Sequence, residues 1–189
     1  MLNRWRIVLH SICLAPLLWL ASVLFSGDES ALGADPIKEL IHFLGDTAIV
    51  IFCLMYLLGI VLQRLRLPEY QILRRTLGLW ACAYALLHMV AFLGLELAWE
   101  IPLFPQEVVR RPYLVVGAFA LALLMLLAIS SLPSLKRRLG KGWFSLQQWG
   151  YVALVAGGVH YYWSLKSISI QPLLVFALIG TIVVLRLKR

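Results

Sequence analysis

The sequence contains few charged residues, since Asp, Glu, Lys and Arg make up only 14% of its 189 positions and nine of them are acidic. Hydrophobic residues account for 62% of the chain, and the mean hydropathy is +0.88. A soluble globular domain has about 25% charged residues. The composition therefore excludes an ordinary soluble domain and indicates an integral membrane protein.

Several motifs that would point to other chemistries are also missing. The chain has no Gly-rich phosphate-binding fingerprint, and its three cysteines, Cys13, Cys53 and Cys82, form no CxxC pair. This excludes zinc ribbons and covalent haem attachment through CxxCH. The loops leave no room for a separate soluble domain, so a flavin-, nucleotide- or molybdenum-binding fold would have to lie on another chain.

Six apolar segments are each long enough to cross a bilayer, which takes about 20 residues. They cover residues 5–25, 38–62, 72–95, 112–132, 143–163 and 171–187. The sequence therefore predicts a single all-α membrane domain over residues 1–189, built as a bundle of six transmembrane helices. The first segment is longer than a signal-peptide core and lacks a clear cleavage site, so we expect it to be retained.

The basic residues are distributed as in a multi-pass membrane protein with both termini in the cytoplasm. In that orientation thirteen of the 17 Lys and Arg residues face the cytoplasm, and only Lys38, Arg110, Arg111 and Lys166 lie outside. Of the nine acidic residues, only Glu69 is on the inner side. This is the positive-inside bias, and it explains the net charge of +8 without a nucleic-acid partner.

Two histidines, His88 and His160, end strips of small residues with the same helical spacing. The two strips are offset by 72 positions, and they comprise Gly78, Ala81 and Ala85 before His88, and Gly150, Ala153 and Gly157 before His160. Such steps fall on one face of an α-helix. Two strips facing each other would form a flat slot with an imidazole on either side, as a bis-histidine haem requires. The same spacing is also typical of helix packing in membranes.

Other polar residues lie at the predicted outer ends of these segments. His42 is one helical turn from Asp46, whose carboxylate could orient the imidazole, and it could flank the same cofactor. Arg110, Arg111 and Tyr113 would suit the binding of anionic groups at the cofactor edge, such as porphyrin propionates. The acidic and aromatic loop 96–111 suits either a partner protein or the membrane interface.

With these residues placed, the chain resembles the MsrQ (YedZ) family, the haem-binding membrane subunits of the periplasmic methionine sulfoxide reductase system. The resemblance covers nearly the whole chain. It is carried by GADPIKELIHFLGDTA (33–48), RRTLGLWACAYALLHM (74–89), RRPYLVVG (110–117), LKRRLGKGW (135–143) and HYYWSLK (160–166).

The resemblance implies a six-helix fold of the ferric reductase type in the bacterial inner membrane, with haem b ligated by His88 and His160. It also implies an electron-transfer subunit of an oxidoreductase complex, without substrate chemistry on this chain. Electrons would come from a cytoplasmic flavin reductase or from quinol. They would pass to a periplasmic molybdopterin subunit that reduces methionine sulfoxide.

The chain departs from ferric-reductase-type folds at the position of a second, inner haem. The corresponding positions, 13 residues nearer the cytoplasm, hold Arg75 and Gln147, and neither is an ordinary haem ligand. This departure therefore predicts one tightly held bis-histidine haem per chain. An electron would have to cross roughly 20 Å, so we expect an inner relay such as FMN near Arg74 and Arg75, a haem involving His10, or direct reduction by quinol.

Three alternative functions remain at this stage. A quinol- or flavin-linked ferric reductase would use the same histidines without the sulfoxide reductase. A small transporter could use them to relay protons, and a membrane anchor could use loop 96–111 only to tether a partner. A visible spectrum separates the two haem proteins from the other two.

Overall fold

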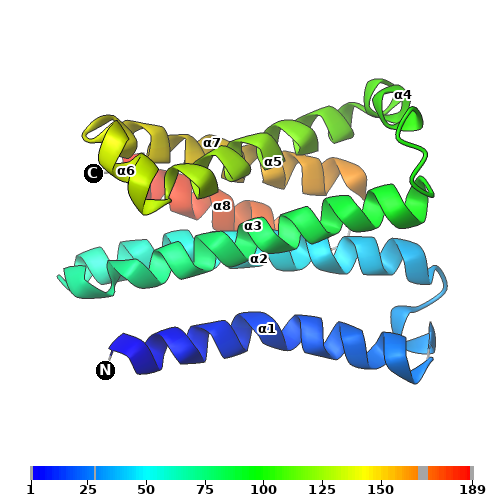
Figure 1. The fold of residues 1–189 in the computed structure, drawn as a ribbon, viewed down its shortest axis with the longest axis horizontal. Coiled ribbons are helices and arrows are strands. Elements are labelled where there is room, and N and C mark those ends of the chain that lie inside the picture. Colours follow the sequence, from blue (N-terminus) through cyan, green and yellow to red (C-terminus); the bar gives the residue numbers. More distant parts are fainter. Residues whose placement is uncertain (1, 28, 166–169, 188–189) are drawn as a thin grey trace. The chain divides into compact units, whose positions relative to one another are not determined.

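The computed structural model describes residues 2–27, 29–165 and 170–187, and over these ranges it consists of helices and turns without a strand (Figure 1). This confirms the prediction of an all-α protein. Lys166, Lys188 and Arg189, which entered the charge count, lie outside the described residues. The long helices are α1 (Leu2–Ser26), α2 (Pro36–Arg64), α3 (Ile72–Ala91), α5 (Pro112–Ser130), α7 (Gly142–Ser164) and α8 (Ile170–Leu187).

Within these ranges, five helical segments are long and apolar enough to cross a membrane. They are Leu2–Ser26, Pro36–Arg64, Pro68–Glu96, Pro112–Ser130 and Ile170–Leu187. The sixth predicted segment corresponds to α7, which has 23 residues and is not among these five. The long helices agree with the predicted ranges to within a few residues, while six crossings and cytoplasmic termini stay predictions.

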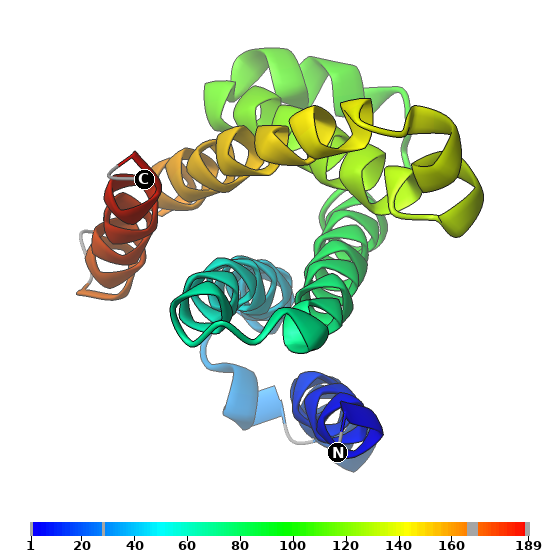
Figure 2. The same cartoon turned by 90° about the vertical axis from the view of Figure 1, so that its left-hand side faces the viewer.

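The chain divides into two compact units, residues 1–101 and residues 102–189. In the first unit α2 and α3 pack against each other along their length, and α1 packs mainly on α3 (Figures 1 and 2). In the second unit α5 packs along α7, and α8 packs on α7. Each unit therefore contains one intimate pair of long helices, α2 with α3 and α5 with α7.

Local sequence signals explain where several helices begin. Asp35 caps α2, because its Oδ1 accepts a hydrogen bond of 3.2 Å from the backbone N–H of Lys38. Pro36, Pro112 and Pro133 are the first residues of their helices, where a missing N–H costs nothing.

Two segments expected to be loops contain short helices. Within loop 96–111 lies α4 (Leu103–Arg110), and the connection between the predicted segments 112–132 and 143–163 contains α6 (Pro133–Leu139). The Lys136 ammonium lies 4.3 Å from the centre of the Trp143 ring, which joins α6 to the start of α7. Short 3₁₀ turns, Glu29–Leu32 and Pro68–Gln71, and a π-helical turn, Phe92–Glu96, complete the described chain.

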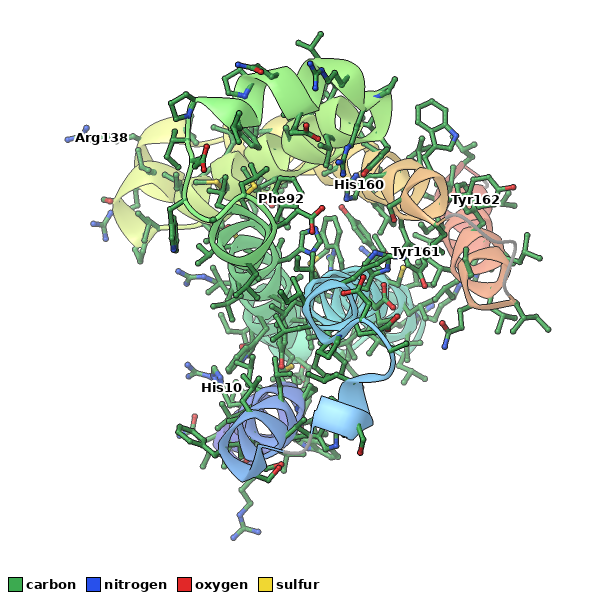
Figure 3. All side chains as sticks on the ribbon, turned by 90° about the vertical axis from the view of Figure 1, so that its right-hand side faces the viewer. His10, Phe92, Arg138, His160, Tyr161 and Tyr162 are labelled. Atoms are coloured by element: carbon green, nitrogen blue, oxygen red, sulfur yellow. The ribbon has the colours of Figure 1, made fainter. Side chains whose placement is uncertain are left out.

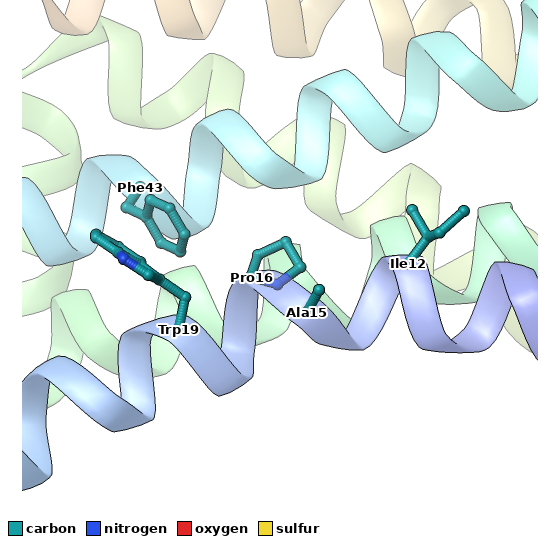
Figure 4. Close-up of a pocket in the computed structure, with 5 residues that line it drawn as sticks. All are labelled: Ile12, Ala15, Pro16, Trp19 and Phe43. Atoms are coloured by element: carbon teal, nitrogen blue, oxygen red, sulfur yellow. The ribbon is translucent and has the colours of Figure 1, made fainter.

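Helix α1 is attached to the first unit by polar contacts with α3. The Tyr84 hydroxyl donates a 2.7 Å hydrogen bond to the carbonyl oxygen of Cys13, and the Tyr84 side chain is fully buried. An apolar groove remains beside α1, lined by Ile12, Ala15, Pro16, Trp19 and Phe43 (Figure 4). Its lining has no titratable side chain, so it suits a hydrocarbon chain and offers no group for chemistry.

The buried Tyr84 hydroxyl gives a test of how α1 is held. Replacing Tyr84 by Phe leaves the Cys13 carbonyl without this donor, which should cost about 1–2 kcal/mol. We expect the midpoint of thermal unfolding in detergent to fall by a few degrees, with α1 becoming more sensitive to proteolysis. Tyr162→Phe, an exposed tyrosine on α7, is the matched control. An unchanged midpoint in Tyr84→Phe would contradict the anchoring role.

Candidate functional site: two histidine cradles

His88 lies near the end of α3 and makes a hydrogen bond to the backbone of α2. Its Nδ1 is 2.8 Å from the carbonyl oxygen of Ile41. A carbonyl oxygen can only accept, so Nδ1 carries the proton and donates. In the neutral ring the lone pair is therefore on Nε2. This bond sets both the tautomer and the direction of the imidazole, as hydrogen bonds do for metal-binding histidines.

His160 is held in the same way in the second unit (Figure 3). Its Nδ1 lies 2.8 Å from the carbonyl oxygen of Tyr113 at the start of α5. The Tyr113 ring also packs beside the imidazole, with ring centres 5.8 Å apart. Both histidines that the sequence singles out thus have the same tautomer, with Nδ1 protonated and the lone pair on Nε2.

A glycine gives each imidazole access to its carbonyl. Gly45 follows Ile41 by four residues, and Gly117 follows Tyr113 by four, so each glycine lies over the carbonyl on the next helical turn. A Cβ at Gly45 would lie 3.2 Å from Cε1 of His88, and a Cβ at Gly117 would lie 2.7 Å from Cε1 of His160. We call each set of carbonyl, glycine and imidazole a histidine cradle.

The two cradles extend the 72-residue repeat to the partner helices. Gly117 stands 72 positions after Gly45, and Tyr113 stands 72 after Ile41, the same offset that separates the histidines. The spacing along the helices that carry the histidines does not reveal these glycines, because both lie on the partner helices. Applying the 72-residue shift to the preceding helix would have found them.

The small-residue strips play a more mixed role than predicted. A Cβ at Gly78 would lie 3.0 Å from the sulfur of Met55 on α2, so Gly78 contacts the neighbouring helix. Ala81 and Ala153 are almost fully buried. The other members are Gly150, which is buried, and Ala85 and Gly157, which are half-buried. Gly78 is therefore a helix-packing residue, and a cofactor slot along the whole strip stays a prediction.

The outer polar residues are only partly available for anions. The Arg111 Nε forms a 2.8 Å ion pair with Glu107, and its Nη1 lies 3.5 Å from the Tyr113 hydroxyl. Its charge is thus already balanced within the unit, whereas Arg110 is exposed. His42 is half-buried on α2 and makes no hydrogen bond with Asp46, so the predicted orientation of His42 by that carboxylate is absent here.

His10 is arranged differently from the two cradle histidines (Figure 3). Its Nδ1 accepts a 2.9 Å hydrogen bond from the indole N–H of Trp80, so the proton of the neutral ring is on Nε2. The lone pair of His10 is therefore used by Trp80, which does not suit the proposed role as an inner haem ligand.

The remaining inner candidates are also not arranged as metal ligands. Gln147 donates from Nε2 to the Ser130 hydroxyl at 2.9 Å and to the Leu127 carbonyl at 3.2 Å, which ties α7 to α5. Arg75 is exposed, and Arg74 lies against α2. In the described part of the chain, no three His, Cys, Asp or Glu residues group as they would to bind a metal ion.

The glycines of the cradles give a graded test. Gly117→Ala should displace the His160 ring more than Gly45→Ala displaces His88, because the added methyl group comes closer. We expect ¹⁵N NMR spectra of histidine-labelled protein to show a weakened Nδ1–H hydrogen bond in that order. Gly180→Ala, at a helical glycine with open space around it, should leave both signals in place. Equal spectra for all three variants would contradict the cradle geometry.

Comparison with known proteins identifies the family of this chain. The family model described as "Ferric reductase like transmembrane component" matches residues 44–158, a segment that includes Gly45, His88 and Gly117. A protein from Pasteurella multocida (strain Pm70), named "Protein-methionine-sulfoxide reductase heme-binding subunit MsrQ", is 52% identical over 174 residues. The alignment covers 92% of this chain and 84% of that relative. This chain therefore belongs to the MsrQ family of ferric reductase-like transmembrane proteins.

Proposed function

We propose that this chain is the haem-binding, electron-transferring membrane subunit of a methionine sulfoxide reductase system. The observation that carries the proposal is the pair of equivalent histidine cradles, each of which directs a neutral imidazole with its lone pair on Nε2. The relative from Pasteurella multocida is named as a heme-binding subunit of such a system. We assign His88 and His160 as the two axial ligands.

The residues of the cradles fit a b-type haem. Two axial imidazoles require two neutral rings that offer the same nitrogen, and each cradle supplies one. Donation from Nδ1 to a carbonyl makes the imidazole a stronger electron donor and prevents the ring from rotating. A bound haem would supply one-electron redox chemistry, and His88 and His160 would hold it.

We assign one haem to each chain. At the inner level Gln147 is bound to the end of α5, and His10 is bound to Trp80. A conventional second haem would need two further imidazoles, and His42 belongs to the outer end of α2. The inner electron carrier is therefore proposed to be a flavin, FMN or a docked flavoprotein, or a membrane quinol.

The direction of electron flow follows from the predicted orientation in the bacterial inner membrane. The cradles lie near the helix ends assigned to the periplasm, so the haem serves as the exit for electrons. The partner there is the periplasmic molybdopterin-containing subunit, and the donor is a cytoplasmic flavin reductase or quinol. Basic residues at the inner ends would attract an acidic reductase or an anionic flavin.

An exposed indole on the outer side suits contact with the periplasmic partner. Trp99 is 59% exposed, and its ring packs over Gly94, where a Cβ would lie 3.0 Å from Cζ2. Ala98 and Trp99 both have positive φ angles, 47° and 63°, which are costly for residues other than glycine. This backbone directs the indole outward beside two exposed carboxylates, Glu96 and Glu100.

The ligand assignment is tested by removing each histidine. We expect His88→Ala and His160→Ala to lose most of the haem, because each removes one of two axial bonds. His10→Ala should retain it, since the lone pair of His10 is used by Trp80, and His42→Ala should change occupancy or potential less. The measurement is the reduced visible spectrum of the purified protein. A normal low-spin spectrum in His88→Ala would contradict the assignment of the axial ligands. Wild-type protein without haem would instead favour one of the alternative functions, a small transporter or a membrane anchor.

The stoichiometry is tested by a pyridine-haemochrome assay. We expect one haem per polypeptide in the wild-type protein, because no second pair of imidazoles is available at the inner level. Gln147→His should not raise this value, since Arg74 and Arg75 provide no second imidazole. Two haems per wild-type chain would show that the inner level binds haem by other ligands.

A further inference from the structure

An acidic side chain lies within α2, directly beside the glycine of the His88 cradle. Asp46 follows Gly45 and is ten residues after Pro36, which places it about 15 Å along the helix. A Cβ at Gly45 would lie 3.0 Å from Nδ1 of His88. One Cα–Cβ bond and one Cα–Cα step further, the Cα of Asp46 is within about 8.5 Å of that nitrogen. A charge on Asp46 is therefore close enough to act on a charge bound at this cradle.

The carboxylate of Asp46 has no partner of its own in the part of the chain that the structure describes. The side chain is half-buried, and it forms neither a hydrogen bond nor an ion pair there. The charge that acts on it is the like charge of Glu39, seven residues earlier on the same face of α2. An ionisable residue within a membrane segment is costly without a partner and usually has a function.

The elements packed against the outer half of α2 provide no permanent positive charge. They are α1, η1 (Glu29–Leu32), α3 and η3 (Phe92–Glu96). His88 of α3 already donates to the Ile41 carbonyl, and Lys38 of α2 acts on His42 rather than on Asp46. Within this unit a proton is therefore the available neutralising partner for the carboxylate. The titratable residues of the facing parts of these elements are Cys13, Glu29, Cys82, Tyr84, His88 and Glu96.

A change of charge at the haem would alter how tightly a nearby carboxyl group binds its proton. Reduction adds one electron, and the added negative charge favours the protonated form of that group. Two unit charges about 12 Å apart at an effective dielectric constant of about 20 change each other's binding by about ten-fold. The effect is reciprocal, so a bound proton makes the haem easier to reduce by the same factor.

We propose that Asp46 binds a proton more tightly when the haem held by His88 is reduced, so that it takes up a proton with the electron. This inference rests on the proposed function. The electron comes from the inner donor, and the proton comes from water at the outer end of α2. When the periplasmic partner removes the electron, Asp46 returns the proton to that water. The partner's reaction consumes both, because reduction of a methionine sulfoxide takes two electrons and two protons and yields the thioether and water.

The pH dependence of the haem potential tests this inference. The purified full-length haem protein in a neutral detergent is titrated by spectroelectrochemistry across the pH range in which it is stable. Since the reduced state binds more protons, the potential of the wild type falls as the pH rises. A ten-fold difference in proton affinity corresponds to a total fall of about 59 mV. Asp46→Asn, which has a similar shape but cannot titrate, loses most of this fall, and Asp46→Glu keeps it.

Two neighbours on the same face of α2 are the matched controls. Glu39→Gln removes the acidic side chain about two helical turns away, and His42→Ala removes the titratable ring between the two carboxylates. Both variants keep a fall of wild-type size, although Glu39→Gln shifts its midpoint, since Glu39 acts on Asp46. Loss of the fall in either control to the same extent as in Asp46→Asn would overturn the assignment to Asp46.

A second measurement identifies the group in the wild-type protein. The chain contains three aspartates, Asp28, Asp35 and Asp46, and only the last lies within α2. Infrared difference spectra between the reduced and oxidised protein should show a carboxylic acid band that shifts when aspartate is labelled with ¹³C. In Asp46→Glu the band remains but no longer responds to the label. A difference spectrum without an aspartate band overturns the inference even if Asp46→Asn does not fold.

The outcomes separate this inference from the proposed function. Wild-type protein with a normal haem spectrum and a potential that is independent of pH would overturn the role of Asp46 and leave the function standing. The same holds if Asp46→Asn retains the full pH dependence, because another group then binds the proton. Wild-type protein without haem would overturn both. A pH-dependent potential that requires a carboxylate at position 46 supports both.

Discussion

The hydrogen bond from an imidazole Nδ1 to a helix carbonyl is the interaction on which the candidate site depends. It joins the side chains of His88 and His160 to the backbone of the adjacent helix. It also selects the Nε2 lone pair for coordination and sets the ring direction. In a medium of low dielectric constant such a bond is stronger than in water. The direction of each imidazole is thus set by a backbone carbonyl of the adjacent helix.

This bond in turn explains the close packing of the two helix pairs. The carbonyl of Ile41 or Tyr113 already lies in the helix, and a second donor can approach only if the residue one turn later has no side chain. Gly45 and Gly117 meet that condition, although glycine within a helix costs about 1 kcal/mol relative to alanine. The α2–α3 and α5–α7 pairs therefore each contain one histidine cradle. The proposed cofactor, with two equivalent axial ligands, would require such a pair.

The two units differ where the repeat is no longer kept. At the outer level glycine and histidine recur in both pairs. At the inner level the first pair has Gly59 with Arg74, and the second has Ser131 with Gln147. Neither an amide nor a guanidinium is an ordinary haem ligand, so the helix pairs continue to this level without providing a second pair of haem ligands. In the second pair Gln147 is bound to Ser130, and in the first pair the Nε of Arg74 is buried without a hydrogen-bond partner among the described residues.

The sequence by itself determined where the long helices lie, and its spacing singled out His88 and His160. Hydropathy, the Asp35 cap and the prolines act locally, and the 72-residue spacing of His88 and His160 is visible without any contact. It did not reveal α4 or α6, because segments of eight and seven residues carry too little periodic signal against their flanking loops. The tertiary structure alone decided which backbone carbonyl each imidazole contacts and that Gly78 contacts Met55. It also decided that Arg111 forms an ion pair with Glu107 and that His10 accepts a hydrogen bond from Trp80. These outcomes depend on the register and rotation of one helix against another, which arise from packing between segments distant in the chain.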